Sequence, residues 1–339
     1  MRLYRRLLLA ATLLAVVVIG LGAYVRLSDA GLGCPDWPGC YGHLLGVPES
    51  AHEQQAAVAA YPRQPLDAGK AWKEMIHRYA AGSLGLLILA VCLLAWRAEL
   101  RGRQSPALPT VLLGLVGLQA ALGMWTVTLL LKPLVVTLHL LGGMGTLALL
   151  VALALRGTAA AAFAPAVRRP AVVALLAVIG QVALGGWVSS NYAALACADF
   201  PFCQGQWLPP ADFAQAFSLH RDLGYTAQGE LLPAAALTAI HLAHRLGAVL
   251  VLLAVGTLAA RLLRSGQRRW GAALLALLGL QLGLGIANVL LALPLPLAVA
   301  HNLGAAALLS AVLAVTLRSR AGPLPAATRP ATPAAGALT

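Results

Sequence analysis

The chain of 339 residues is unusually apolar, with 60% hydrophobic residues, 10% charged residues and a mean hydropathy of +0.81. Soluble domains usually contain about 25% charged residues, so this composition excludes an ordinary cytoplasmic enzyme, a disordered protein and a nucleic-acid binder. The net charge of +13 then bears on orientation in a lipid bilayer rather than on an acidic partner.

Eight apolar stretches are long enough to cross a bilayer, because a transmembrane helix needs about 20 apolar residues. The first apolar stretch comes after Arg2, Arg5 and Arg6, as the apolar part of a signal peptide comes after basic residues. It lacks a small-x-small cleavage site, so we predict that it is retained as a span. We therefore expect an all-α membrane protein. In chain order the predicted spans cover residues 7–27, 74–96, 108–130, 133–155, 170–190, 234–260, 270–292 and 296–317.

The charged residues are distributed unequally between the two sides of the predicted membrane. The N-terminus, the tail and the loops after spans two, four and six hold 16 of the 24 basic residues and one acid, Glu99. By the positive-inside rule this side is cytoplasmic, so both termini are expected in the cytoplasm. Two outer loops are long, 28–73 and 191–233, and the tail 321–339 is rich in Pro, Ala and Thr, which predicts disorder.

The two halves of the chain contain an internal repeat. Gly22-Ala-Tyr-Val-Arg recurs as Gly185-Gly-Trp-Val-Ser at a shift of 163, and Gly117-Leu-Gln-Ala-Ala-Leu-Gly recurs as Gly279-Leu-Gln-Leu-Gly-Leu-Gly at a shift of 162. Four spans per half is an even number, so both halves have the same orientation and the repeat is parallel. We expect two pseudo-symmetric four-helix bundles side by side, in residues 1–158 and 159–320.

Four of the five cysteines lie in the long outer loops, as the pairs Cys34/Cys40 and Cys197/Cys203. The outer face of a bacterial-type membrane is oxidising, so each pair could close a disulfide. Free thiols and a metal site are the alternatives. Cys92 lies in an apolar span, where a small buried side chain is its simplest role.

Four histidines occupy repeat-matched positions near the outer ends of even-numbered spans. His77 and His244 correspond at a shift of 167, and His139 and His301 at a shift of 162. Ionisable residues inside spans are functional candidates, and two histidines on facing helices could grip one metal or heme iron from both sides. A hydrogen bond joining two helices is the alternative. Zinc is less well suited, because it needs further ligands.

Other polar residues accompany the histidines. Glu74 precedes His77 by one turn, where a carboxylate could act as an acid or base or serve only as a helix-start residue. Arg78 and Arg245 directly follow two of the histidines and could pair with heme propionates or extend to the interface. Gln119 and Gln281, in spans three and seven, could bridge helices or line a site. Small residues such as Gly142 and Gly304 could admit a flat macrocycle or allow close helix packing.

These segments together resemble the heme A synthase family over all eight spans. The resemblance is carried by Gly22-Ala-Tyr-Val-Arg-Leu-Ser-Asp-Ala-Gly-Leu-Gly-Cys-Pro-Asp-Trp-Pro-Gly-Cys, Glu74-Met-Ile-His-Arg, Leu138-His-Leu, His244-Arg-Leu-Gly and His301-Asn-Leu-Gly-Ala.

The resemblance implies an oxidoreductase that converts a methyl group of heme O to the formyl group of heme A for terminal oxidases. It implies heme b as a cofactor on His244 and His301, heme O between His77 and His139, and Glu74 as the catalytic carboxylate. It also implies a disulfide between Cys34 and Cys40, and a second pair found in only some members.

The family further implies a cell-membrane location, with a heme O synthase and oxidase-assembly factors as partners. The oligomeric state stays open, and a homo-oligomer is one alternative. Two other functions compete with the synthase: a diheme b-type electron-transfer cytochrome and a transporter with parallel repeats. All four histidines have a similar outer depth, which makes a poor electron path across the membrane. The spans also lack charged, broken helices at mid-membrane.

Overall fold

The computed structural model describes residues 2–97, 101, 105–156 and 163–319, and its named elements are all helices. Eight of these helices are long and apolar enough to cross a membrane, which confirms the all-α membrane fold class. The predicted disordered tail lies outside the described residues. The eight spans are α1 (Arg2–Leu27), α3 (Ala68–Ala95), α5 (Ala107–Thr128), α6 (Pro133–Leu155), α7 (Pro165–Ser190), α9 (Ala234–Arg264), α10 (Arg268–Leu290) and α11 (Leu295–Arg318).

Several helices extend beyond the apolar stretches that predicted them. The largest difference is in α3, which begins at Ala68 rather than near residue 74, with the Asp67 side chain capping it through Lys70 N–H. His77 therefore lies more than two turns from the helix start instead of about one. Hydropathy detects only the part of a helix inside the hydrocarbon core, whereas the polar first turns continue into the interface.

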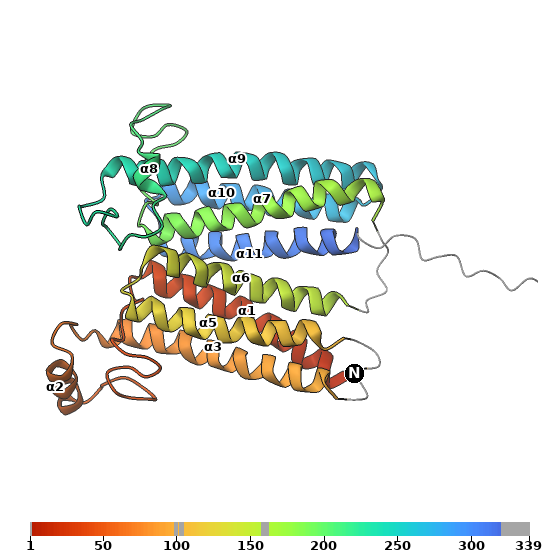
Figure 1. Ribbon diagram of the computed structural model, residues 1–339. Coiled ribbons are helices and arrows are strands. Elements are labelled where there is room, and N and C mark those ends of the chain that lie inside the picture. Colours follow the sequence, from red (N-terminus) through yellow and green to blue (C-terminus); the bar gives the residue numbers. More distant parts are fainter. Residues whose placement is uncertain (1, 98–100, 102–104, 157–162, 320–339) are drawn as a thin grey trace, which may run out of the picture.

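The spans form two neighbouring groups of four (Figure 1). In the first group α1 packs on α3 and α6, and α5 packs on α3 and α6; in the second, α9 packs on α7 and α10, and α11 packs on α7 and α10. The groups meet where α1 and α6 contact α11 and where α6 contacts α7. This arrangement is compatible with the two expected bundles.

The two long outer loops lie at one end of the molecule, opposite the N-terminus (Figure 1). The first contains the short helix α2 (Ala51–Ala60) and the second contains α8 (Phe213–Ala216). Each loop also has a left-handed residue at a matched position, with φ of 50° at Tyr41 and 55° at Gln204. Because residues other than glycine rarely adopt this conformation, the match is compatible with a repeat that extends into the loop backbone.

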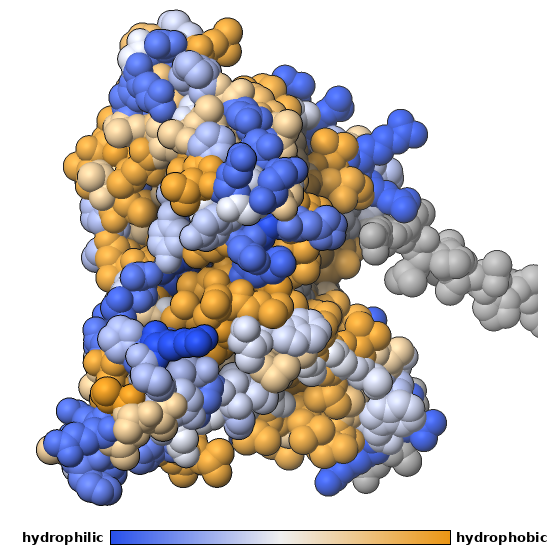
Figure 2. Space-filling view, turned by 60° about the vertical axis from the view of Figure 1, so that its left-hand side comes forward, coloured by the Kyte–Doolittle hydropathy of each residue, from blue (hydrophilic) through white to orange (hydrophobic). Residues whose placement is uncertain are grey.

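The apolar core runs through both groups of helices, while many large apolar side chains face outward. Ile88, Val255 and Val312 are fully buried in one continuous cluster. Leu86 and Leu253 are more than 60% exposed. Hydrophobic side chains accordingly cover much of the surface over the spans, and hydrophilic ones gather over the loops (Figure 2). A surface of this kind requires lipid as its solvent.

Candidate functional site

The structure distributes the four predicted histidines over four helices, two in each group. His77 lies on α3 and His139 on α6, and the two are within electrostatic range of one another. His244 on α9 and His301 on α11 form the corresponding pair. All four side chains are half-buried, and the two rings of each pair lie close enough to interact electrostatically.

Each histidine ring packs against a glycine on the preceding span. A methyl group added at Gly22 would lie 3.0 Å from Cε1 of His77, and one at Gly185 would lie 3.2 Å from Cε1 of His244. The corresponding distances are 3.4 Å from Gly123 to His139 and 3.1 Å from Gly285 to His301. An added methyl group would crowd the ring at Gly22, Gly185 and Gly285 but would reach ordinary contact distance at Gly123, so three of the glycines closely restrict where the imidazole lies.

Three glutamines contact the histidines, and one of them, Gln181, was not identified from the sequence. Gln181 Nε2 donates to His244 O at 3.0 Å and lies 3.2 Å from Nδ1 of that ring. Gln281 Nε2 donates to His301 O at 3.0 Å and lies 3.3 Å from Nε2. In the amide orientation that satisfies both its atoms, Gln119 donates to His139 O at 3.1 Å and to Nδ1 at 2.9 Å.

The donor set fits an iron porphyrin with two axial imidazoles. Among the described residues no group of three or more His, Cys, Asp or Glu could hold a metal ion, which disfavours a zinc site. Nδ1 of His77 and Nδ1 of His301 are buried without a hydrogen-bond partner in the described part of the chain. Buried polar atoms are normally paired, so these rings are suited to a ligand between the helices.

Glu74 is buried, with only 5% of its surface exposed, and it contacts the first outer loop. Its carboxylate accepts hydrogen bonds from Cys34 N–H at 3.0 Å and from Arg78 Nη2 at 2.5 Å. The alternative that Glu74 is a helix-start residue is wrong, because the first turn of α3 has no acid. In the second half, His241 takes the corresponding contact and accepts from Cys197 N–H at 3.3 Å.

Arg78 and Arg245 both hold the loops above the histidines. Arg78 Nη1 donates to the carbonyls of Asp36, at 3.0 Å, and of Gly39. Arg245 donates to the carbonyls of Asp199 and Phe202, both at 2.7 Å, and of Cys197 at 3.1 Å. Their pairing with propionates stays a prediction, and apart from the contacts of Arg78 with Glu74 and of Arg245 with the Phe200 ring, the contacts described here are with the loop main chain.

Each of these loops is closed by a disulfide, as the spacing of the cysteines suggested. Cys34 bonds to Cys40 and Cys197 bonds to Cys203, each across six positions. The carboxylate of Asp199 also accepts hydrogen bonds from Gly205 N–H and Gln204 N–H, both at 2.8 Å. The Gly205 N–H bond in particular lowers the pKa of Asp199 below its ordinary value of 3.8. The loops are thus ordered covers over the histidine-bearing ends of the helices.

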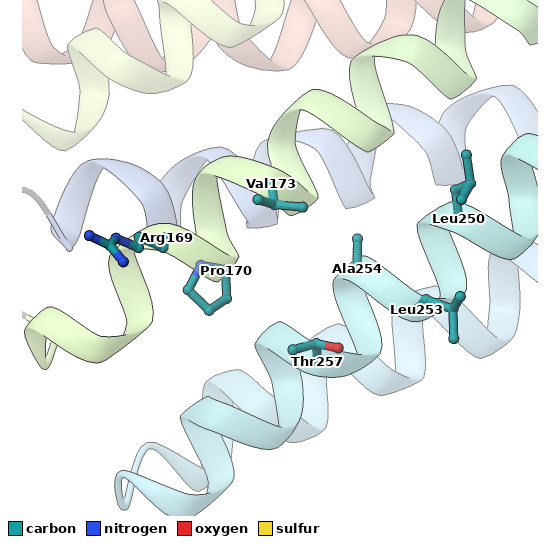
Figure 3. Close-up of a pocket in the computed structure, with 7 residues that line it drawn as sticks. All are labelled: Arg169, Pro170, Val173, Leu250, Leu253, Ala254 and Thr257. Atoms are coloured by element: carbon teal, nitrogen blue, oxygen red, sulfur yellow. The ribbon is translucent and has the colours of Figure 1, made fainter.

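A further apolar groove lies between α7 and α9, away from the histidines (Figure 3). It has a volume of about 490 Å³, and its lining includes Pro170 and Leu253 but no candidate residue. Its lining is almost wholly apolar and lies on helices that face lipid, so we assign it no part in the chemistry.

Comparisons with known proteins give a consistent result. A family model, COX15-CtaA, described as cytochrome oxidase assembly protein, matches residues 5–313. The chain is 45% identical to the heme A synthase of Shewanella oneidensis, over 91% of this chain and 94% of that protein. It is 32% identical to the heme A synthases of Caulobacter sp., over 92% and 94%, and of Methylobacterium radiotolerans, over 88% and 84%.

Proposed function

Because this chain belongs to the COX15-CtaA family of cytochrome oxidase assembly proteins, we propose that it is a heme A synthase, an oxidoreductase that acts on heme O. The proposed reaction converts the methyl group of heme O to the formyl group of heme A by two successive hydroxylations and loss of water, a four-electron oxidation whose electrons pass to an oxidant supplied from outside the chain. The observation that carries this proposal is the pair of histidine sites at one end of the molecule, of which only the first has a carboxylate beside it.

The second half, residues 159–320, would hold the heme b cofactor. When bound, this group supplies electron transfer, since an iron held by two histidines has no vacant coordination position. His244 and His301 would bind its iron, and Gln181 and Gln281 hold these two histidines through their main-chain carbonyls. Gly185 and Gly285 fix the position of the rings against the adjoining helices.

The first half, residues 1–158, takes heme O as its substrate between His77 and His139. Glu74 is one turn from His77 on the same helix, so its carboxylate faces the same region of the bundle. Arg78 and Cys34 N–H each bind the carboxylate and restrict its orientation. Glu74 is therefore the group that can hold or accept a proton beside the reacting substrate.

The surroundings of the site define how the protein meets its partners. The protein lies in the cell membrane. As the positive-inside rule predicts, both termini are on the cytoplasmic side and the disulfide loops are on the outer side. Heme O arrives from a heme O synthase, and heme A leaves toward oxidase-assembly factors. Self-association of the chain is not required to complete either histidine pair, because all four ligands come from one chain.

Heme extraction from cells that co-express this chain with a heme O synthase tests the function. We expect heme A, identified by chromatography, only in cells that contain the chain. Heme B bound to the purified chain, with heme O available and no heme A or hydroxylated intermediate formed, would contradict the synthase and favour a b-type cytochrome.

Replacing Glu74 with histidine tests the carboxylate separately from the loop. The second half already uses His241 to accept from Cys197 N–H, so Glu74→His offers Cys34 N–H the same kind of acceptor. We expect this variant to retain heme b and its disulfide loop but to lose heme A formation by at least 100-fold, within the range of general acid–base catalysis. Glu74→Asp is the matched control that keeps the acid. Wild-type heme A formation by Glu74→His would show that Glu74 only anchors the loop.

A further inference from the structure

Three of the four histidines are held by an arrangement that the fourth one lacks. In each of the three, a glutamine amide donates to the histidine carbonyl and lies against the glycine three residues farther along the histidine's helix. We call this arrangement a glutamine clamp. The clamps are Gln119 with His139 and Gly142, Gln181 with His244 and Gly247, and Gln281 with His301 and Gly304.

The glycine in each clamp is required by the space that the amide occupies. A Cβ at Gly142 would overlap the amide of Gln119, and one at Gly247 or Gly304 would overlap the amide oxygen of the facing glutamine. The clamp therefore has a two-part signature, Gln-x3-Gly on one helix and His-x2-Gly on its neighbour. The first glycine seats the histidine ring and the second admits the amide.

The fourth position departs from both parts of this signature at once. Val18 stands 163 residues before Gln181, four residues before the ring-seating Gly22, and Ala80 stands three residues after His77. The contact between ring and glycine is kept, since the ring of His77 still packs against Gly22. The amide is missing and Ala80 stands where each clamp has its second glycine, so both parts of the clamp are absent around His77.

A clamp restrains its histidine in two ways. The amide holds the histidine carbonyl, which fixes one turn of the helix, and at His244, His301 and His139 it also lies within 3.3 Å of a ring nitrogen. Partners of this kind orient metal ligands, and removing one typically costs 10- to 100-fold in affinity. No glutamine contacts His77 in the described part of the chain, and the main chain of Val18, the residue at the matching position, lies beside its ring.

We propose that the glutamine clamps decide which heme is kept and which is exchanged, and that His77 is the ligand that releases the porphyrin. This rests on the proposed function, in which the first half takes a substrate that must enter and leave. The second half has a clamp on both histidines and retains its heme. The first half has a clamp on His139 alone, so its heme is held firmly on one side and loosely on the other.

Reciprocal exchange of the clamp tests this proposal. Val18→Gln with Ala80→Gly builds the clamp in the first half, and Gln181→Val with Gly247→Ala removes one from the second. Each pair is made in a purified full-length chain with a single heme site, obtained with His244→Ala for the first half and His77→Ala for the second. The probe is ferric iron protoporphyrin IX, and its transfer to excess apomyoglobin is followed by absorbance.

We expect the parental first-half site to release heme at least tenfold faster than the second-half site. Adding the clamp should slow release from the first half about tenfold, and removing it should speed release from the second half about tenfold. The low-spin electron paramagnetic resonance signal, which reports the orientation of the axial imidazoles, should change with the clamp. Ala80→Gly alone is the control, because it opens the space without supplying the amide, and it should leave release unchanged.

Equal release rates in the two parental sites, or rates unaffected by both exchanges, would overturn the clamp proposal while leaving the synthase intact. Failure of either parental single-site chain to bind heme would instead overturn the assignment of the histidine pairs and the proposed function with it. Because one variant gains a clamp and the other loses one, poor folding of either alone does not decide the outcome.

Discussion

Replacing Gly33 with alanine should detach the first disulfide loop from the start of α3. A Cβ at Gly33 would lie 2.6 Å from the carbonyl carbon and oxygen of Lys70 and 2.8 Å from the nitrogen of Ala71. These are main-chain atoms in the first turn of a capped helix, and they cannot rotate away as a side chain would. The loop itself must therefore move, taking with it Cys34 N–H, which donates to Glu74.

The size of this effect follows from the two interactions involved. Overpacking of a close contact costs about 1–3 kcal/mol, and losing a hydrogen bond to a charged group costs about 1.5–3 kcal/mol. If the loop moves to relieve the overpacking, it loses the hydrogen bond instead, so the two costs do not add in full. We therefore expect the free energy that holds the loop against α3 to fall by about 3 kcal/mol. Since about 1.4 kcal/mol is a factor of ten, amide hydrogen exchange in the loop should rise roughly 100-fold.

Hydrogen exchange of residues 28–47 in detergent-solubilised protein, read by mass spectrometry, measures this change. Gly82→Ala is the matched control, because no atom lies within 4 Å of its added Cβ, and it should leave exchange in the loop unaltered. An increase of less than threefold in Gly33→Ala would refute the close contact and the anchoring of the loop through Glu74.

Two further predictions concern the second disulfide loop. Arg245→Gln should raise amide hydrogen exchange in that loop at least tenfold, because one neutral amide cannot replace the guanidinium donors to the carbonyls of Cys197, Asp199 and Phe202. Unchanged exchange would show that the disulfide alone orders the loop. The folded loop lowers the pKa of Asp199 through Gly205 N–H, so this carboxylate stabilises the loop above pH 3.8 and loses that effect as the pH falls through its lowered pKa. Exchange corrected for its intrinsic pH dependence should therefore rise below pH 3.8 in the wild type but not in Asp199→Asn, and identical profiles would contradict the contact.

Much of the fold could be predicted because membrane insertion depends on local properties of the chain. A run of about 20 apolar residues is sufficient to indicate a span. The eight spans were predicted in this way, and the repeat placed His77 opposite His244 and His139 opposite His301 in the alignment of the halves. The paired cysteines were likewise visible as rare residues at matched spacing in the outer loops.

The contacts around the histidines required the tertiary structure, because they join residues that are distant in the sequence. Gln181 is 63 positions from His244, and nothing in its own span distinguishes it from a glutamine that merely bridges helices. Glu74 and Cys34 are 40 positions apart, and the sequence allowed Glu74 to be a helix-start residue. The signals were present as Gln-x3-Gly and His-x2-Gly, but they have meaning only once the two helices are known to pack together. Hydropathy along a helix determines that it spans the membrane, whereas the packing of its neighbours determines which polar atoms meet.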